Sequence, residues 1–332
     1  MTCYHPIKAF IVDENGTNRK FHFASCDKDY IVYNHQKIEK YVLLPCGKCI
    51  GCRVDQSREW ANRMMLELKY HDCACFITLT YDDDNLPMNQ YVDENGEVQL
   101  KATLRKTDFQ EFMKRLRWHI APKRIRFFSA GEYGGKTERP HYHAIIFGYD
   151  FPDKREWMRT KDGYIQYRSE LLEKIWPFGF SMICEVNWNT CAYVSRYCTK
   201  KIGAGRNIYY QTFNIEPEFN TMSRRPGLGR KYYDEHKDEV YIKSDEGVPH
   251  LQEIFLSNNK GGLKISPPKY FDRLYEKDEP FHMDEIKARR KEIAENELDR
   301  KLRESGKSMR EYLEVQEIYF KERVKSLRRD KI

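Results

Sequence analysis

The chain has 332 residues, of which 33% are Asp, Glu, Lys or Arg, and its formal net charge is +7. This length can bury the core of one large domain plus an extension, and the small positive excess fits a polyanionic partner without requiring one. No apolar run approaches the ~18–20 residues that span a bilayer, and residues 1–6 lack the pattern of a secretory signal. We therefore expect a cytoplasmic protein with no membrane partner, whose ten cysteines are reduced thiols or metal ligands.

The first 45 residues alternate short apolar and aromatic runs with Asp, Asn and Gly turns. Residues 8–12, 20–24 and 30–33 are the runs, and each is typical of a strand or extended segment.

A cysteine cluster follows, with Cys46, Cys49 and Cys52 at a spacing of three. Closely spaced thiolates bind soft or borderline metals, and a structural zinc ion usually takes four ligands. Cys3, His5 or Cys26 could supply the fourth. Two interpretations stay open, a structural Zn²⁺ or three buried reduced thiols around a Gly-rich turn, and an iron–sulfur cluster is favoured less than zinc.

Helix and strand patterns then alternate. Residues 57–70 carry an apolar stripe at helical spacing, and residues 75–81 predict a strong strand with alternating faces. Thr107-Asp108-Phe109-Gln110 has the form of a capping box, followed by the apolar periodicity of a helix that packs on a sheet.

The most informative stretch is residues 139–147, which begins Arg-Pro-His-Tyr-His and continues into β-branched and aromatic residues. In a strand, His141 and His143 point to the same face. Residues 124–130 predict the partner strand of a hairpin, in which Glu132 would face His141 across the ladder. Two imidazoles and a carboxylate with open coordination positions suit Mn²⁺ or Mg²⁺, although a pair of packed histidines is the alternative.

After the hairpin, we expect a charged loop over residues 150–162, a short helix over 169–176 and another strand over 180–186.

A second group of polar residues lies on the next predicted helix. Tyr193, Tyr197 and Lys200 are spaced four and three apart, so a helix places them on one face. Asn187 or Asn189 can cap this helix, and Gly203 can end it. The alternative is an amphipathic helix whose tyrosines only pack.

The last third of the chain changes character twice. Residues 204–235 interleave aromatic side chains with arginines that include Arg224 and Arg225, a pattern suited to single-stranded nucleic acid. Residues 236–280 look loop-rich. Residues 284–332 are dense in Lys, Arg and Glu and predict a helical extension, with a helix pair around Gly306.

Several motifs occur in order and together resemble one family. They are Pro45-Cys-Gly-Lys-Cys-Ile-Gly-Cys52, Phe76-Ile-Thr-Leu-Thr-Tyr81, Gly131-Glu-Tyr-Gly134, Arg139-Pro-His-Tyr-His143, the tyrosine helix and Met222-Ser-Arg-Arg-Pro-Gly227. His-x-His on a strand with Tyr-x-x-x-Tyr-x-x-Lys on a later helix resembles the two-tyrosine branch of the HUH endonuclease superfamily. The set is similar to the replication initiation proteins of microviruses of gokushovirus type. The middle residue of the His pair, Tyr142, departs slightly from an aliphatic pattern.

The resemblance implies an α+β fold with a central, mainly antiparallel sheet, flanking helices and the charged C-terminal helical extension. We expect an endonuclease domain over residues 1–240, a loop-rich connector over 241–283 and the extension over 284–332. The implied activity is metal-dependent nicking of a viral DNA origin by a Tyr nucleophile in rolling-circle replication, with a 5′-phosphotyrosine intermediate and later rejoining.

The resemblance also implies roles for single residues and partners. Tyr193, Tyr197 and Lys200 would be catalytic, with Lys201 as a substitute for Lys200, and the metal ligands would be His141, His143 and Glu132. DNA would contact Arg139, Arg196, Lys201, Arg224 and Arg225. The partners would be single-stranded and origin DNA, a host helicase and a replication polymerase, in the cytoplasm of a bacterial host.

A second function from another class also fits the sequence: a non-enzymatic, zinc-containing, single-stranded DNA-binding protein that uses its tyrosines for stacking. Within the enzyme class, a plasmid initiator or a transposase is a further alternative. Covalent attachment to an origin oligonucleotide separates a nickase from a binding protein.

Overall fold

The structure is a computed structural model that describes residues 3–13, 20–25, 28–135, 137–160, 163–197, 204–242, 250–251, 253–258 and 261–325. Among these residues, no helix combines the length and the apolar character needed to cross a lipid bilayer.

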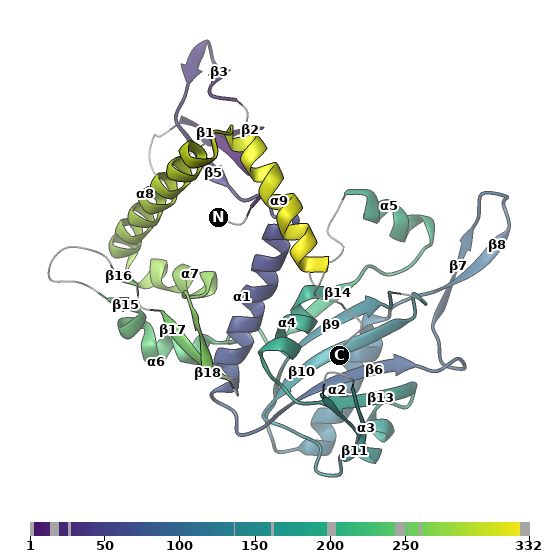
Figure 1. Cartoon of the computed structure of the whole chain (residues 1–332). Coiled ribbons are helices and arrows are strands. Elements are labelled where there is room, and N and C mark those ends of the chain that lie inside the picture. Colours follow the sequence, from purple (N-terminus) through teal and green to yellow (C-terminus); the bar gives the residue numbers. More distant parts are fainter. Residues whose placement is uncertain are drawn as a thin grey trace. The chain divides into compact units, whose positions relative to one another are not determined.

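One large sheet dominates the fold (Figure 1). It has seven strands in the spatial order β11 (Arg155–Arg159), β12 (Ile165–Arg168), β13 (Gly179–Cys184), β6 (Ala74–Tyr81), β10 (Pro140–Phe147), β9 (Arg126–Tyr133) and β14 (Phe219–Met222). Every neighbouring pair is antiparallel. The prediction of an α+β fold with an antiparallel sheet and flanking helices is therefore confirmed.

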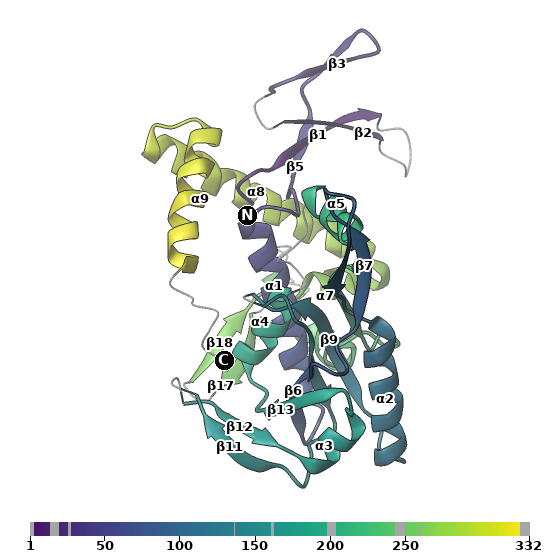
Figure 2. The ribbon, with the colours of Figure 1, turned by 90° about the vertical axis from the view of Figure 1, so that its right-hand side faces the viewer.

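Side-chain alternation gives the sheet two different faces. On the central strand β10, Tyr142, Ala144 and Ile146 enter one hydrophobic cluster, whereas Ile145 and Phe147 enter another. Helices cover both faces: α4 lies on one side of the sheet and α2 on the other (Figure 2).

The first face packs on α2 (Lys106–Ile120) and α3 (Glu170–Ile175). From α2 it receives Phe109, Phe112 and Leu116, all of which are buried. Each buried side chain of this size contributes about 1.5–3 kcal/mol relative to an exposed one, so this face is an apolar core.

The second face packs on α1 (Ile50–Leu68) and α4 (Trp188–Tyr197). It continues beyond the apolar cluster into His143 and His141, the same-face residues before Ile145 on β10. The polar end of this face is where the candidate site lies.

Several boundaries differ from the predictions. Helix α1 begins at Ile50 and already includes Cys52, whereas the apolar stripe predicted a start at residue 57. The capping-box prediction is wrong, because α2 begins after Arg105 with no side-chain cap. The hydroxyl of Thr107 instead donates to Asp108, and Asp108 also accepts a hydrogen bond of 2.6 Å from Tyr81.

The prediction of a loop over residues 150–162 is also wrong, because β11 lies there as an exposed edge strand. Residues 236–280 hold more regular structure than expected. The elements beyond the main sheet in this part are α5 (Ala204–Thr212), α6 (Arg230–Val240), β15 (Tyr241–Ile242), β16 (His250–Leu251), β17 (Ile254–Asn258), β18 (Gly261–Ile265) and α7 (Lys269–Asp278). An unpredicted hairpin joins β7 (Met88–Val92) to β8 (Val98–Ala102).

By internal contacts the chain forms two compact units, residues 1–55 with 284–329 and residues 56–283. The first contains a sheet of β2 (Lys20–Ser25), β1 (Ile7–Asp13) and β5 (Tyr41–Leu44), a hairpin of β3 (Ile31–Tyr33) and β4 (Gln36–Ile38), and helices α8 (Pro280–Ser305) and α9 (Met309–Lys325). Gly306, at a φ of 62°, separates the two helices, which confirms the predicted helix pair. The three functional segments predicted from the sequence are a different division and stay a prediction.

Candidate metal and nucleophile site

Register brings the three expected metal ligands together on the second sheet face. Glu132 on β9 lies directly opposite His141 on β10, as predicted. The Glu132 Oε1 atom is 2.8 Å from His141 Nε2 and 3.2 Å from His143 Nε2. The three potential ligand atoms all lie within 4.8 Å of one another, so this group could hold a metal ion.

The other ring nitrogen of each histidine has its own partner. His141 Nδ1 is 3.0 Å from the carbonyl oxygen of Arg139, and His143 Nδ1 is 2.9 Å from Thr78 Oγ1 on β6. An Nδ1–H that donates to these oxygens leaves the Nε2 lone pair directed at Glu132, which is the tautomer that a metal ligand needs.

Burial and charge act against each other at Glu132, which is only 2% exposed. Burial alone would raise the pKa of this carboxyl, but the hydrogen bonds to His141 and His143 and the charges of these rings outweigh it and lower the pKa to about 2. The group is therefore a carboxylate at neutral pH, ready to accept a cation.

Tyr193 adjoins this group from α4, which lies over β9 and β10 (Figure 1). Its ring meets the ring of His143 edge-on, with centroids 5.3 Å apart, and that of Phe76 at 6.1 Å. The prediction that the tyrosine helix packs beside the His strand is confirmed for this residue.

Local sequence and buried hydroxyls fix the position of α4. Asn187 caps its start, since Asn187 Oδ1 accepts from the backbone N–H of Thr190 at 3.0 Å. Further along, Ser195 Oγ lies 3.0 Å from Ser57 Oγ of α1, and Ser57 Oγ donates to the carbonyl of Ala192. Because these groups are buried, the hydrogen bonds set how α4 packs on α1.

Other expected site residues fall at or beyond the end of α4. Tyr197 is its last residue, and the structure describes its backbone but not its side chain. Lys200 and Lys201 lie outside the described residues, as does Gly203, the expected end of the helix. Arg196 turns its side chain back along the helix, and its Nε donates to the carbonyl of Ala192 at 3.3 Å.

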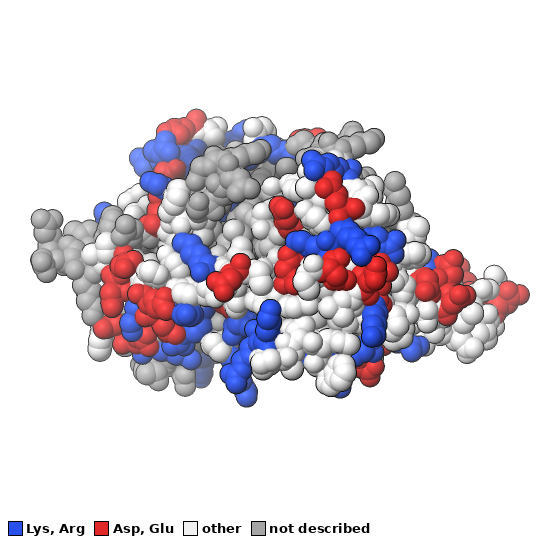
Figure 3. Space-filling view, turned by 90° about the horizontal axis from the view of Figure 1, so that it is seen from below, with Lys and Arg blue, Asp and Glu red and all other residues white. Residues whose placement is uncertain are grey.

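The expected DNA-contacting arginines have different surroundings. Arg139 donates to the carbonyl of Tyr81 at 2.9 Å and pairs with Asp83 at 2.5 Å, so it links the end of β6 to the start of the His strand. Arg224 and Arg225 are exposed and follow edge strand β14. On the face seen from below (Figure 3), the described Lys and Arg side chains are interspersed with Asp and Glu, so that face shows no broad field of one sign.

Pairing places an exposed aromatic residue in line with the ligands, which the sequence did not indicate. Directly opposed residues on neighbouring strands share a face, and Phe180 pairs with Thr80, Thr80 with His141, and His141 with Glu132. Phe180 is 64% exposed. At the sheet edge, Trp157 is also exposed, and the Arg168 guanidinium lies 5.7 Å from its ring centroid.

The second group of potential ligands is the cysteine cluster. Of the three open choices for a fourth ligand, the structure brings in Cys3. His5 is instead hydrogen-bonded to Glu317, and Cys26 lies outside the described residues.

Comparisons with known proteins agree with this geometry. Residues 74–202, which include both β10 and α4, match the family model for Replication-associated protein ORF2. The chain is 31% identical to Replication-associated protein ORF2 of Spiroplasma virus 4, over 94% of this chain and 93% of that protein. It is 30% identical to Replication-associated protein VP4 of Bdellovibrio phage phiMH2K, over 89% and 85% of the two chains. The chain belongs to this family of microvirus replication-associated proteins, and no solved structure matches it.

Proposed function

We propose that this protein initiates rolling-circle replication by nicking one strand of a viral DNA origin and later rejoining it. The observation that carries the proposal is the contact between the Tyr193 ring and His143, which places a potential nucleophile beside the Glu132, His141 and His143 group. A packed histidine pair would not need a buried carboxylate between the two rings.

The donor set fits a hard or borderline divalent cation. Two imidazole nitrogens and one carboxylate oxygen leave coordination positions open, which suits Mg²⁺ or Mn²⁺ in a reactive site. When bound there, such a cation would act as a Lewis acid on the scissile phosphate and orient it. The residues prepare the site by holding both Nε2 atoms and the carboxylate in place through Thr78 and the carbonyl of Arg139.

In the nicking step, the phenolic oxygen of Tyr193 attacks phosphorus and the 3′ oxygen leaves. The Tyr proton is lost, the departing oxygen gains one, and the 5′ end is held as a phosphotyrosine ester. A free Tyr has a pKa of about 10, so the phenol needs help to ionise. We assign that help to Lys200, with Lys201 as its substitute. Attack of a 3′ hydroxyl on the ester reverses the step, so rejoining needs no ATP.

Tyr197 follows Tyr193 by one helical turn. Rolling-circle replication needs one transesterification to start and another to cut and close the circle. While one Tyr holds the 5′ end, the other can attack, so the two can alternate.

The DNA path in this proposal crosses the second sheet face. Phe180 lies in the same row as His141 and offers its exposed ring for base stacking. Trp157 with Arg168 extends this path, and Arg139, Arg196, Lys201, Arg224 and Arg225 contact phosphates.

The wider assignment follows from the same reaction. The nicking domain spans residues 1–240, with 241–283 as connector and 284–332 as extension. A nicked origin requires a host helicase to unwind it and a polymerase to extend the 3′ end, in the cytoplasm of the bacterial host.

The test is a covalent adduct. The protein is incubated with single-stranded origin oligonucleotide and Mn²⁺, separated on a denaturing gel, and the DNA-bearing peptide is mapped. We expect adducts on Tyr193 and Tyr197, partial nicking by Tyr193→Phe or Tyr197→Phe alone, and none by the double variant. Tyr209→Phe, on α5, is the matched control and should behave like the wild type.

An adduct on another residue in the double variant would overturn the assignment of the nucleophiles. Tight binding of the oligonucleotide by the wild type, with no adduct under any metal condition, would instead favour the non-enzymatic DNA-binding protein.

A further inference from the structure

We infer that Cys3, Cys46, Cys49 and Cys52 together bind one structural Zn²⁺ ion, with Cys3 as the fourth ligand. This inference is independent of the proposed nicking activity, because it concerns a different set of residues with a different chemistry.

The separations of the sulfur atoms support a single tetrahedral ion. Cys46 Sγ lies 4.0 Å from Cys52 Sγ, and Cys49 Sγ lies 3.9 Å from Cys3 Sγ. All four sulfurs lie within 4.8 Å of one another. Zinc–sulfur bonds of about 2.3 Å in a tetrahedron place the sulfurs about 3.8 Å apart, whereas a disulfide needs about 2 Å. The observed separations match the ion.

Backbone N–H groups point at three of the four sulfurs. Cys3 Sγ accepts from the N–H of Cys46 at 3.2 Å, and Cys46 Sγ accepts from that of Cys49 at 3.3 Å. Cys49 Sγ accepts from the N–H groups of Tyr4 at 3.4 Å and Cys52 at 3.5 Å. Hydrogen bonds of this kind stabilise the thiolate, which is the form that binds metal.

The ligand set identifies the kind of site. Four thiolates fill all the positions of a tetrahedral ion and leave none for water or substrate, which is the mark of a structural zinc site. An iron–sulfur cluster distributes its cysteines over different iron atoms, and four sulfurs gathered this closely suit one ion better.

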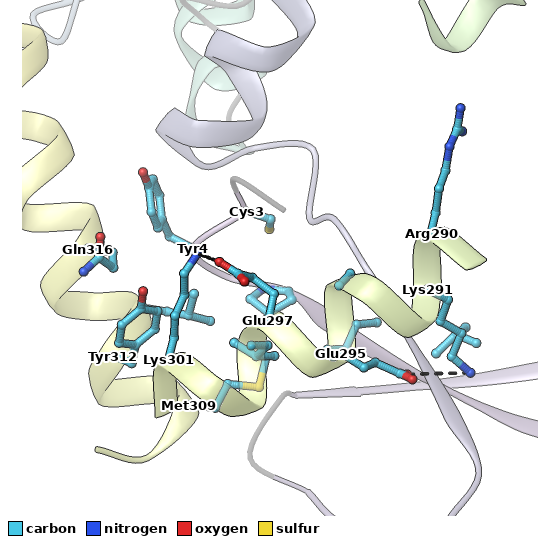
Figure 4. A pocket seen from close by; sticks show the side chains of 16 residues that line it. Cys3, Tyr4, Arg290, Lys291, Glu295, Glu297, Lys301, Met309, Tyr312 and Gln316 are labelled. Carbon is cyan, nitrogen blue, oxygen red and sulfur yellow. Dashed lines mark ion pairs between the residues drawn. The ribbon is translucent and has the colours of Figure 1, made fainter. Parts of the chain in front are cut away.

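The surrounding unit has reason to need such an ion. In its sheet, Phe21 and Phe23 are exposed by 40% and 61%, so β2 contributes little to a core. Beside Cys3 and Tyr4, a cavity of about 520 Å³ separates the N-terminal segment and β5 from α8 and α9 (Figure 4). A sparse core is commonly supplemented by a metal or disulfide, and here the ion would close the loop from residue 3 to residue 46.

The test counts zinc in the His143→Ala background, so that no ion at the histidine site is included. The chain, purified without chelator, should contain about one zinc by elemental analysis, and Co²⁺ in its place should give the intense absorption of a tetrahedral thiolate complex. Cys3→Ser should lose most of the zinc, whereas Cys73→Ser, an exposed cysteine outside the group, should keep it.

A second measurement does not depend on the variants folding. Titration of the same protein with a mercurial reagent should release one zinc as the thiols of the cluster react, followed with a zinc-sensitive dye. Full zinc content in Cys3→Ser would overturn Cys3 as the ligand. A protein with neither zinc nor Co²⁺ binding, or one that holds iron, would overturn the zinc site.

Discussion

The two groups of potential metal ligands differ in how many positions they fill. The cysteine group presents four soft sulfurs, whereas the Glu132 group presents two nitrogens and one oxygen. Four thiolates close a coordination shell, while three mixed ligands leave it open. The same chain thus carries the chemistry of a stabilising site and that of a reactive site.

They differ equally in what holds the ligands. Three cysteines lie within seven residues, and their sulfurs are bonded mainly by N–H groups of the same loop. The histidines are oriented by Thr78 on a neighbouring strand and adjoined by Tyr193 from a helix fifty residues on. Local sequence builds the first group, and tertiary structure builds the second.

The largest expected effect separates the two groups by chelation. EDTA should lower origin cleavage by roughly 10³-fold, because a catalytic metal contributes several kcal/mol and each 1.4 kcal/mol is tenfold. The zinc should stay bound, since its shell is closed. Cleavage on a denaturing gel and elemental analysis of the dialysed protein measure both. If cleavage is undiminished in EDTA, the open site has no catalytic metal, and if zinc leaves with the activity, the two groups do not differ as argued.

Thr78→Val removes the hydroxyl that faces His143 Nδ1 with little change in shape. Loss of such a supporting hydrogen bond typically lowers metal affinity or activity by about 10- to 100-fold, so more Mn²⁺ should be needed for half-maximal cleavage. Zinc content should not change. The matched control is Thr80→Val, on the same face of β6. Equal Mn²⁺ requirements in the two variants would remove Thr78 from the site.

Phe180→Ala should weaken single-stranded DNA binding without touching either ligand group. Loss of one stacked base costs about 1–2 kcal/mol, or roughly 5- to 30-fold in affinity. Fluorescence anisotropy in the absence of divalent metal measures it. Phe180→Trp should retain binding, and Phe255→Ala, an equally exposed Phe on β17, should bind like the wild type. A similar loss in Phe255→Ala would mean that exposed aromatics act unspecifically.

The smallest effect concerns Arg224 and Arg225. Changing either to Ala should weaken binding only a few-fold and reduce the salt dependence of log Kd by about 0.7 for each phosphate of single-stranded DNA that the variant no longer neutralises. Zinc content and Mn²⁺ requirement should both stay at their wild-type values. An unchanged salt slope would place these arginines away from the DNA.

Regular alternation made much of this architecture predictable. The pattern of residues 75–81 and 139–147 gave two central strands and the shared face of the histidines, and loop length gave the pairing of Glu132 with His141. Capping by Asn187 followed from residue type. These features depend on neighbours in sequence or across one turn.

Features that depend on distant pairing were missed. Nothing local distinguishes Thr78 from Thr80, and only the ladder with β10 places Thr78 against His143. The edge strand β11 is exposed at every residue and so lacks the apolar alternation of a strand. Cys3 could not be preferred over His5 or Cys26, because the choice depends on how residues 3–5 meet the turn at Cys46.

The position of β14 sets a boundary for any shortened protein. The family match ends at residue 202, but β14 (Phe219–Met222) pairs with β9 over the segment just before Glu132, and Leu228 completes the cluster beneath α4. A fragment ending at residue 202 would leave β9 as a bare sheet edge, which invites pairing with other chains. Crystallisation fragments should therefore extend past Leu228.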